Sequence, residues 1–337
     1  MEFFVYDQDN KKIDVLQNYS SIQWKPSYDS TGTFEIHALE TENNVKNMQL
    51  GYKLVKQEDN TIGLIEYVYS KDGSLEIRGH LDNLADRINT STASLRKVPA
   101  DLYQLVNKNK RDLEITVPES TELSINLELD TTWDDLRTTF SDVCTKTGLG
   151  YRMLKKGAVF NCLEVYQGSL RKNVVFSEDI GNMVAQSYLQ DMSSYKNVAI
   201  VAGEGEGANR IVVEVNRMTE GERRYELYVD AKDLQKTWMD EKGTQHTYTD
   251  EEYESQLIQR GQSKLDESRL VDEFTCDIDL TNQTFKYNVD FFLGDIIRVK
   301  SRKYHFSKYF RVSSVNEIQE DGYSIKATLT EYRGGVD

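Results

Sequence analysis

The sequence predicts an α+β protein, mostly β, in which two small β-barrel-like domains flank a mixed α/β middle. Tyr and Phe are abundant, with 20 and 12 residues, and both side chains favour strands. Short alternating runs of apolar and polar residues, separated by turn signals, crowd both ends of the chain. Helical periodicity marks mainly the middle and one later segment, so the two β-rich ends are expected to form separate domains.

Residues 1–92 are predicted to form the N-terminal β-barrel-like domain. Seven closely spaced β runs precede a helix expected over residues 81–88, where apolar residues recur at helical intervals. One run, TFEIHAL (33–39), places three apolar residues on one face: Phe34, Ile36 and Ala38. The opposite face carries His37, which we expect to meet solvent and not a ligand.

Residues 93–170 are predicted to form a small α/β domain. A strong helix should begin near Thr132, with Asp135 in a capping-box-like start, and should end at Gly148. Its apolar side is expected to comprise Trp133, Leu136, Phe140, Val143 and Cys144. A hairpin over residues 150–166 completes this domain.

Residues 171–337 are predicted to form the second β-barrel-like domain, with a helical insertion around residues 249–268. Four residues at intervals of four share one line of this helix: Tyr253, Leu257, Gly261 and Leu265. A glycine costs a helix about 1 kcal/mol relative to alanine. Its place on the apolar line therefore suggests that the helix backbone approaches a sheet closely.

The charge balance excludes several classes of partner. The chain has 41 Lys and Arg against 56 Asp and Glu, a formal charge of −15, and a pI of about 4.9. Such an excess of acid repels phosphate backbones and anionic lipids, so we expect no specific nucleic-acid binding. The longest apolar run, Val198–Ala202, is far too short for membrane insertion, and the start MEFFVYDQDN lacks a signal-peptide pattern.

No residue pattern points to catalysis, a cofactor or a metal. The three cysteines, Cys144, Cys162 and Cys276, are widely spaced and are expected in the core, not in a disulfide framework. The histidines are too few and too dispersed for a metal site or a catalytic triad: His37, His80, His246 and His305. Acid pairs such as Asp134-Asp135 have a simpler explanation at helix starts. We therefore expect no catalytic, cofactor-binding or metal-binding residues.

The most distinctive local feature is the loop Gly203, Glu204, Gly205, Glu206 and Gly207, which follows the strand VAIVA. Three glycines after a strand are typical of phosphate-binding turns, but here carboxylates alternate with the glycines and no Walker lysine follows. We expect a turn with positive φ at a subunit contact. Both carboxylates should project toward Arg or Lys of a neighbouring subunit, which makes this the candidate assembly loop.

Several segments, taken in order, resemble siphophage and prophage tail-tip proteins. They are YKNVAIVAGEGEGANR (195–210), RRYELYVDAKDL (223–234), YNVDFFLGDIIRV (287–299), SIQWKPSYDSTGTFEIHAL (21–39) and TIGLIEYVYSKDGSLEIRGHLDNLADRI (61–88). This is the baseplate-hub or tail-associated family, which is similar to the baseplate hub of contractile-tailed phages. The resemblance implies a phage baseplate-hub-like fold with two barrel-like domains in each subunit.

The resemblance also implies an assembly role without enzymatic activity. Three subunits would form a homotrimeric, pseudo-sixfold ring that joins the sixfold tail tube to threefold distal parts. Its expected partners are a distal tail protein ring, a tape measure protein, and a fibre, spike or receptor-binding protein. The ring would leave a channel for tape measure and DNA, in the virion tail tip after assembly in the host cytoplasm. The chain stops at EYRGGVD, so we expect no receptor-binding or wall-degrading extension.

Two alternatives remain open at the level of sequence. The protein could be a tail-associated cell-wall hydrolase whose middle domain carries the chemistry. It could also be a glycan-binding adhesion module that uses the basic and aromatic segment RVKSRKYHFSKYFRV (298–312). The simpler interpretation of that segment is a hairpin with solvated charges.

Overall fold

The computed structural model describes residues 1–239, 244–279, 284–332 and 334. This part of the chain is mostly β, as the sequence predicts, and contains four α-helices. Its contacts define two compact units. The first unit comprises Met1–Tyr188 with Glu273–Asp337, and the second comprises Leu189–Asp272.

The N-terminal part of the first unit is antiparallel. Its elements are β1 (Phe3–Tyr6), β2 (Lys12–Val15), β3 (Tyr19–Lys25), β4 (Thr33–Leu39), α1 (Glu42–Asn47), β5 (Lys53–Lys56), β6 (Ile62–Lys71) and β7 (Ser74–His80). The strands follow the order β3-β4-β7-β6-β5-β1-β2. Phe34, Ile36 and Ala38 are buried around Trp24, whereas His37 is half-exposed and pairs with Glu35. The predicted alternation of β4 is therefore confirmed.

The helix expected over residues 81–88 does not form. Only a short 3₁₀ turn, η1 (Leu84–Asp86), is present, and Ile88 is exposed. The Asp82 carboxylate accepts a hydrogen bond from the Leu84 backbone N–H at 3.0 Å. A side chain that captures a nearby backbone donor offers the chain an alternative to helix, which explains why this prediction is wrong.

The middle of the first unit has its own core. Its elements are β8 (Ala93–Val98), α2 (Ala100–Asn109), β9 (Ile125–Thr131), α3 (Leu136–Thr147), β10 (Gly150–Lys156) and β11 (Val159–Tyr166). β8 pairs with β9, and β10 with β11 forms the predicted hairpin. Apolar residues of both helices pack with both strand pairs in one cluster.

Helix α3 begins later than the sequence predicts. Asp135 is its N-cap and accepts from the Thr138 N–H at 2.9 Å, whereas the capping-box interpretation starts the helix near Thr132. Trp133 lies outside the helix with φ of 60° and is 69% exposed, so its expected place on the apolar stripe is wrong. Gly148 ends the helix with φ of 68°, as predicted.

The C-terminal part of the first unit is again β. Its strands are β12 (Leu170–Ser177), β13 (Met183–Asp191), β19 (Val271–Ile278), β20 (Ile296–Ser301), β21 (Phe306–Gln319) and β22 (Tyr323–Glu331), although the ends of β13 and β19 belong to the second unit. The order is β13-β19-β22-β21, and β20 pairs with both β21 and β12. Phe274, Phe310 and Val315 are fully buried in the core of this region.

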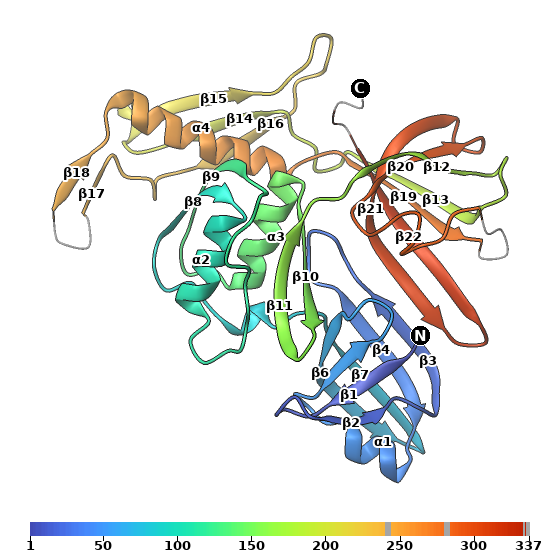
Figure 1. Cartoon of the computed structure of the whole chain (residues 1–337). Coiled ribbons are helices and arrows are strands. Elements are labelled where there is room, and N and C mark those ends of the chain that lie inside the picture. Colours follow the sequence, from blue (N-terminus) through green and yellow to red (C-terminus); the bar gives the residue numbers. More distant parts are fainter. Residues whose placement is uncertain (240–243, 280–283, 333, 335–337) are drawn as a thin grey trace. The chain divides into compact units, whose positions relative to one another are not determined.

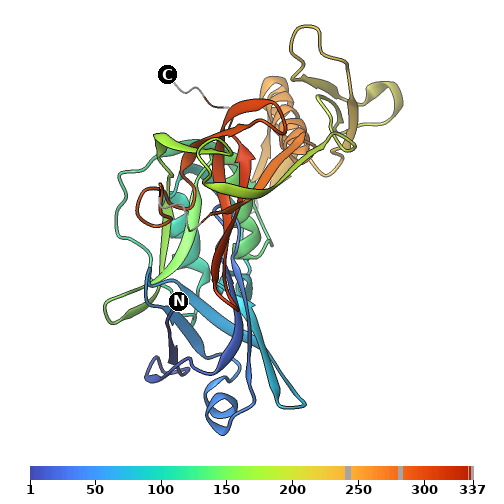
Figure 2. The ribbon, with the colours of Figure 1, turned by 90° about the vertical axis from the view of Figure 1, so that its right-hand side faces the viewer.

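Strand β21 joins the two ends of the chain into one sheet. It pairs with β20 and β22, and its last residues pair with β3 (Figures 1 and 2). In this pairing Glu317 lies opposite Trp24. The resulting 13-stranded sheet is open, because no pairing among the described strands closes a ring. The barrel-like form of the two ends, and the boundaries at residues 92 and 170, therefore stay predictions.

The second unit is a small sheet covered by one helix. Its elements are β14 (Val198–Ala202), η2 (Gly207–Asn209), β15 (Val212–Asn216), β16 (Glu226–Asp230), β17 (Thr237–Met239), β18 (Gln245–Thr247) and α4 (Asp250–Glu267). β14 lies between β15 and β16, and α4 packs on one face of this sheet (Figure 1). Thr249 and Glu252 form a capping box at the start of α4.

Gly261 marks the closest approach of α4 to the sheet. A Cβ at this position would lie 2.7 Å from Cγ2 of Val201 and 2.7 Å from Cγ2 of Val215. Tyr253, Leu257 and Leu265 on the same line are buried. The predicted close approach is confirmed.

Candidate functional site

The loop Gly203–Gly207 connects β14 to η2 and β15 in the second unit. Gly205 has φ of 105° and Gly207 has φ of 55°, both in the region that favours glycine. A Cβ on Gly205 would lie 2.5 Å from the Asn209 carbonyl oxygen. The glycine-dependent turn that the sequence suggests is therefore present, and a larger residue at Gly205 would strain it.

The start of this loop is fixed by Tyr253 of α4. The Glu204 N–H donates to the Tyr253 hydroxyl at 2.8 Å, and that hydroxyl donates to the Leu234 carbonyl at 2.6 Å. A Cβ on Gly203 would lie 2.6 Å from the same hydroxyl oxygen. Gly203 is thus required for close contact, whereas Gly205 and Gly207 supply the turn.

The two carboxylates of the loop differ in their surroundings. Glu204 accepts a hydrogen bond from the Lys236 backbone N–H at 2.9 Å, so it is engaged within its own unit. Hydrogen bonding to Asp250 first, and the charge of Glu204 among others, raise the pKa of Lys236. Glu206 is exposed, and no described residue pairs with its carboxylate. Glu206 is therefore the loop acid that is open to a partner.

Arg210 closes the base of the loop, a role that the sequence analysis missed. Its guanidinium donates to the carbonyls of Ala202 at 2.7 Å and Gly203 at 2.9 Å, and to the Tyr228 hydroxyl at 2.8 Å. It also pairs with Asp230 on β16. The sequence signal for this role is a single Arg three residues after the last glycine of the loop, because carbonyls left unpaired at a strand end need hydrogen-bond donors.

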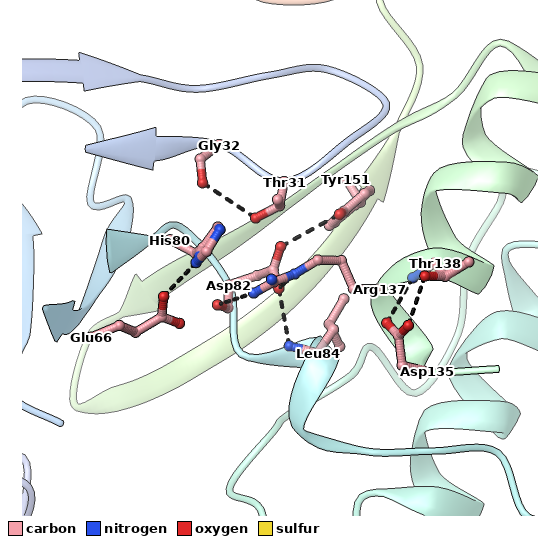
Figure 3. A network of polar contacts seen from close by, with 10 residues as sticks. All are labelled: Thr31, Gly32, Glu66, His80, Asp82, Leu84, Asp135, Arg137, Thr138 and Tyr151. Atoms are coloured by element: carbon pink, nitrogen blue, oxygen red, sulfur yellow. Dashed lines mark hydrogen bonds and ion pairs between the residues drawn. The ribbon is translucent and has the colours of Figure 1, made fainter. Parts of the chain in front are cut away.

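A second polar site lies within the first unit, around the buried carboxylate of Asp82 (Figure 3). Asp82 accepts from Arg137 Nε of α3 at 2.9 Å and from the Tyr151 hydroxyl of β10 at 3.4 Å. Burial first, and then the charge of Asp82, raise the pKa of Tyr151. A pocket of about 240 Å³ adjoins this cluster. Since Asp82 has a cationic partner and two further donors, the cluster is a structural tie between segments.

The thiols are poor candidates for chemistry. All three cysteines are buried and unpaired, and burial raises the pKa of Cys276 to about 12. Burial also raises the pKa of Cys144. At neutral pH both groups are therefore protonated, and a protonated thiol is not a nucleophile. The expected core positions of the cysteines are confirmed.

Two further features bear on the alternatives. Within the described ranges no three His, Cys, Asp or Glu side chains gather in a way that could hold a metal ion. None of the described helices is both long and apolar enough to cross a membrane. The segment 298–312 forms the β20–β21 hairpin, in which Phe310 is fully buried, Arg298 lies opposite Tyr309, and Lys308 pairs with Glu331.

Three of the solved structures that share this fold are phage tail proteins. The 43 kDa tail protein of prophage MuSo2 from Shewanella oneidensis has a TM-score of 0.63 at 11% identity, over 98% of each chain. The prophage tail protein gp18 from Listeria monocytogenes EGD-e has a TM-score of 0.57 at 11% identity, over 99% of this chain and 96% of that one. A tail protein from Neisseria meningitidis MC58 has a TM-score of 0.56 at 11% identity, over 98% and 96%.

The chain belongs to the siphovirus family described as ReqiPepy6 Gp37-like protein, whose family model matches residues 99–329. The resemblance to siphophage and prophage tail proteins is thereby confirmed. No curated protein matches the chain. At the identities above, the solved structures establish the fold alone.

Proposed function

We propose that this protein is a structural hub of a phage or prophage tail tip or baseplate. The observation that carries the proposal is the match of the tail-protein family over residues 99–329. The end-to-end likeness to a prophage tail protein supports it, since 98% of each chain takes part. The protein acts by assembly and not by catalysis.

In this role three copies form a ring through heterologous contacts that close on themselves. The ring joins a distal tail protein ring to threefold fibre, spike or receptor-binding parts, and tape measure protein and DNA pass through its channel. The barrel-like ends, residues 1–92 and 171–337, build the wall. The charge of −15 per copy supports passage of DNA without trapping, because like charges repel. The protein assembles in the host cytoplasm and resides in the virion tail tip.

Loop Gly203–Gly207 is the proposed assembly loop of the second unit. Glu206 offers an exposed carboxylate on a backbone that Gly205 and Gly207 keep in a defined turn. The double variant Glu204→Gln with Glu206→Gln should leave thermal unfolding of the monomer within about 1 kcal/mol of wild type. Ring formation should weaken as it does when salt is added to the native protein. Unchanged assembly of the double variant would show that the loop is a local turn without a role in assembly.

The decisive experiment for the hub is the molecular mass in solution, alone and with the distal tail ring added, measured by light scattering after size exclusion. We expect a complex containing three copies per ring. A chain that stays monomeric with excess distal ring would contradict the hub. Incubation with isolated cell walls tests the hydrolase alternative, which gains support only from fragment release that a single carboxylate substitution abolishes.

A further inference from the structure

Trp133 is presented to solvent in a way that packing within the chain does not explain. Its side chain is 69% exposed, more than that of any other described tryptophan. Its backbone has φ of 60°, a conformation that bulky residues seldom adopt. Such outliers persist where the surrounding structure enforces them, and they gather at functional positions.

The loop that carries Trp133 is held rigidly. The Trp133 N–H donates to the Asn89 carbonyl at 2.9 Å, and the Asn89 N–H donates to the Asp134 carbonyl at 2.9 Å. The Asn89 side chain is fully buried and donates to the Thr131 carbonyl at 3.1 Å. The Thr131 hydroxyl in turn donates to the Asp134 carboxylate at 2.9 Å. A side chain on such a loop loses little conformational entropy when a partner covers it.

Ile88 enlarges the apolar surface beside Trp133. Ile88 is 47% exposed, and its backbone bridges to Asp135 in the same loop. Trp133 and Ile88 together are called the Trp133 patch. Asp86 and Asp134 are both exposed at its margin, and no described cation pairs with either carboxylate. Arg111 also lies at this margin, where its guanidinium donates to the Ile88 carbonyl at 3.0 Å. The patch is thus an apolar projection whose margin carries two acids and one arginine.

The first unit also carries an apolar groove that is bordered by lysines. The groove has a volume of about 440 Å³, and its apolar lining consists of Leu113, Ile115, Ala158, Val159 and Phe160. Val159 is 47% exposed there. Two lysines border it: Lys110 lines the groove, and the ammonium group of Lys155 lies 5.3 Å from the centre of the Phe160 ring. Lys53 also lies near this ring, but it is buried and donates to Asn10. Glu114 is the acidic residue among its lining residues. These residues are called the Val159 groove.

We propose that the Trp133 patch of one copy docks into the Val159 groove of a second copy of this chain. The apolar projection is matched by an apolar groove, and Asp86 and Asp134 at its margin meet Lys110 and Lys155, which favours this pairing over like-charged alternatives. Trp is the residue type most often found to anchor protein interfaces. The contact goes beyond the proposed function, because it names the surfaces through which copies meet and does not depend on the phage ring.

The test is sedimentation equilibrium of the full chain over a wide range of concentration. Wild type should self-associate, and Trp133→Ala and Val159→Asp should each weaken association by about 30-fold or more, as for an interface anchor. Both residues are exposed, so circular dichroism melts should match wild type. Trp238→Ala is the matched control, because Trp238 is also exposed but lies in the second unit.

Mixing the two defective variants gives the sharpest result. Each variant keeps one intact surface, so an equimolar mixture of Trp133→Ala and Val159→Asp should form heterodimers although neither variant associates alone. The proposal is overturned if wild type is monomeric, if either variant associates like wild type, or if the mixture stays monomeric. It is also overturned if acrylamide fails to quench the fluorescence of Trp133 in dilute monomer. Self-association that survives both substitutions would leave the hub proposal standing and remove this contact alone.

Discussion

At the scale of single residues, Tyr28 joins three segments that are distant in the sequence. Its backbone donates to the Ser313 carbonyl at 2.9 Å, and its carbonyl accepts from the Tyr151 N–H at 3.0 Å. Its buried hydroxyl accepts from the Gly168 N–H at 2.9 Å. A Cβ on Gly294 would lie 2.1 Å from the ring, so that glycine is present to admit Tyr28.

Two substitutions of Tyr28 should measure separately what its hydroxyl and its ring contribute to the free energy of unfolding. Tyr28→Phe leaves the Gly168 N–H without its acceptor and should cost about 1–2 kcal/mol of unfolding free energy. Tyr28→Ala also removes the buried ring and should cost about 3–5 kcal/mol. Urea titrations followed by fluorescence measure both values. Equal losses in the two variants would show that the ring contributes nothing beyond the hydroxyl.

Glu178 is expected to make stability depend on acid pH. Desolvation would raise the pKa of its carboxyl, but hydrogen bonds from Gln186 and from the Arg302 and Lys303 N–H groups outweigh this effect and hold the pKa at about 2. Because the folded pKa lies below the unfolded value of 4.5, the stabilisation is present above pH 4.5 and is lost as pH falls toward 2.

The variant Glu178→Gln should remove this dependence. Wild type should lose about 1 kcal/mol more than the variant between pH 5 and pH 3, a value reduced for solvent screening. Hydrogen exchange of the β20–β21 turn at the two pH values checks this. Parallel pH profiles for the two proteins would assign the acid sensitivity to other carboxylates.

At the scale of elements, α4 shows that one glycine can be required by packing against a sheet. Its line of buried residues matches the sequence prediction. For helix α3 the start predicted from the sequence is wrong, because two candidate N-caps, Thr132 and Asp135, lie three residues apart. The structure selects Asp135, which leaves Trp133 outside the helix.

The variant Gly261→Ala should destabilise the protein although alanine is the better helix former. The gain in propensity is about 1 kcal/mol. The new methyl group would lie 2.7 Å from Val201 and from Val215, whose branched side chains yield poorly, and overpacking costs about 1–3 kcal/mol. We expect a net loss of about 1 kcal/mol in urea unfolding, against no loss for the exposed control Ser255→Ala. A stabilised Gly261→Ala variant would show that α4 can move away from the sheet.

At the scale of the whole molecule, the pairing of β21 with β3 is reinforced by a buried ionic cluster. Lys56 of β5 is 1% exposed and pairs with Glu317 of β21, which is 3% exposed, and with Asp59 at 3.1 Å. The Tyr323 hydroxyl donates to Glu317 at 2.6 Å. Burial would lower the pKa of Lys56, but the charges of Asp59 and Glu317 outweigh this and raise it, so Lys56 stays charged.

Removal of one charged member of this cluster should strongly lower the free energy of unfolding. Lys56→Met leaves Glu317 buried without its cation, and the expected loss is about 3–5 kcal/mol. The double variant Lys56→Met with Glu317→Leu should lose less than either single variant, because no uncompensated charge remains. Urea unfolding of the three variants gives the coupling energy. Additive losses would mean that the two groups act independently.

The sequence by itself determined the features that depend on neighbours along the chain. The alternation of β4, the β10–β11 hairpin, the stop at Gly148 and the buried line of α4 all follow from periodicity and local turn chemistry. The glycine-dependent turn at Gly203–Gly207 was visible in the same way.

Tertiary structure alone decided the contacts between distant segments. Pairing of Gln319 with Ile22, the tie between Asp82 and Arg137, and the clamp of Arg210 on the loop join residues that no local pattern links. The exposure of Trp133 belongs here too, because an apolar residue at helical spacing looks the same in sequence whether the helix begins before or after it. The physical reason is that long-range pairing depends on which surfaces meet once the chain is compact, whereas local patterns fix only what each segment can bury.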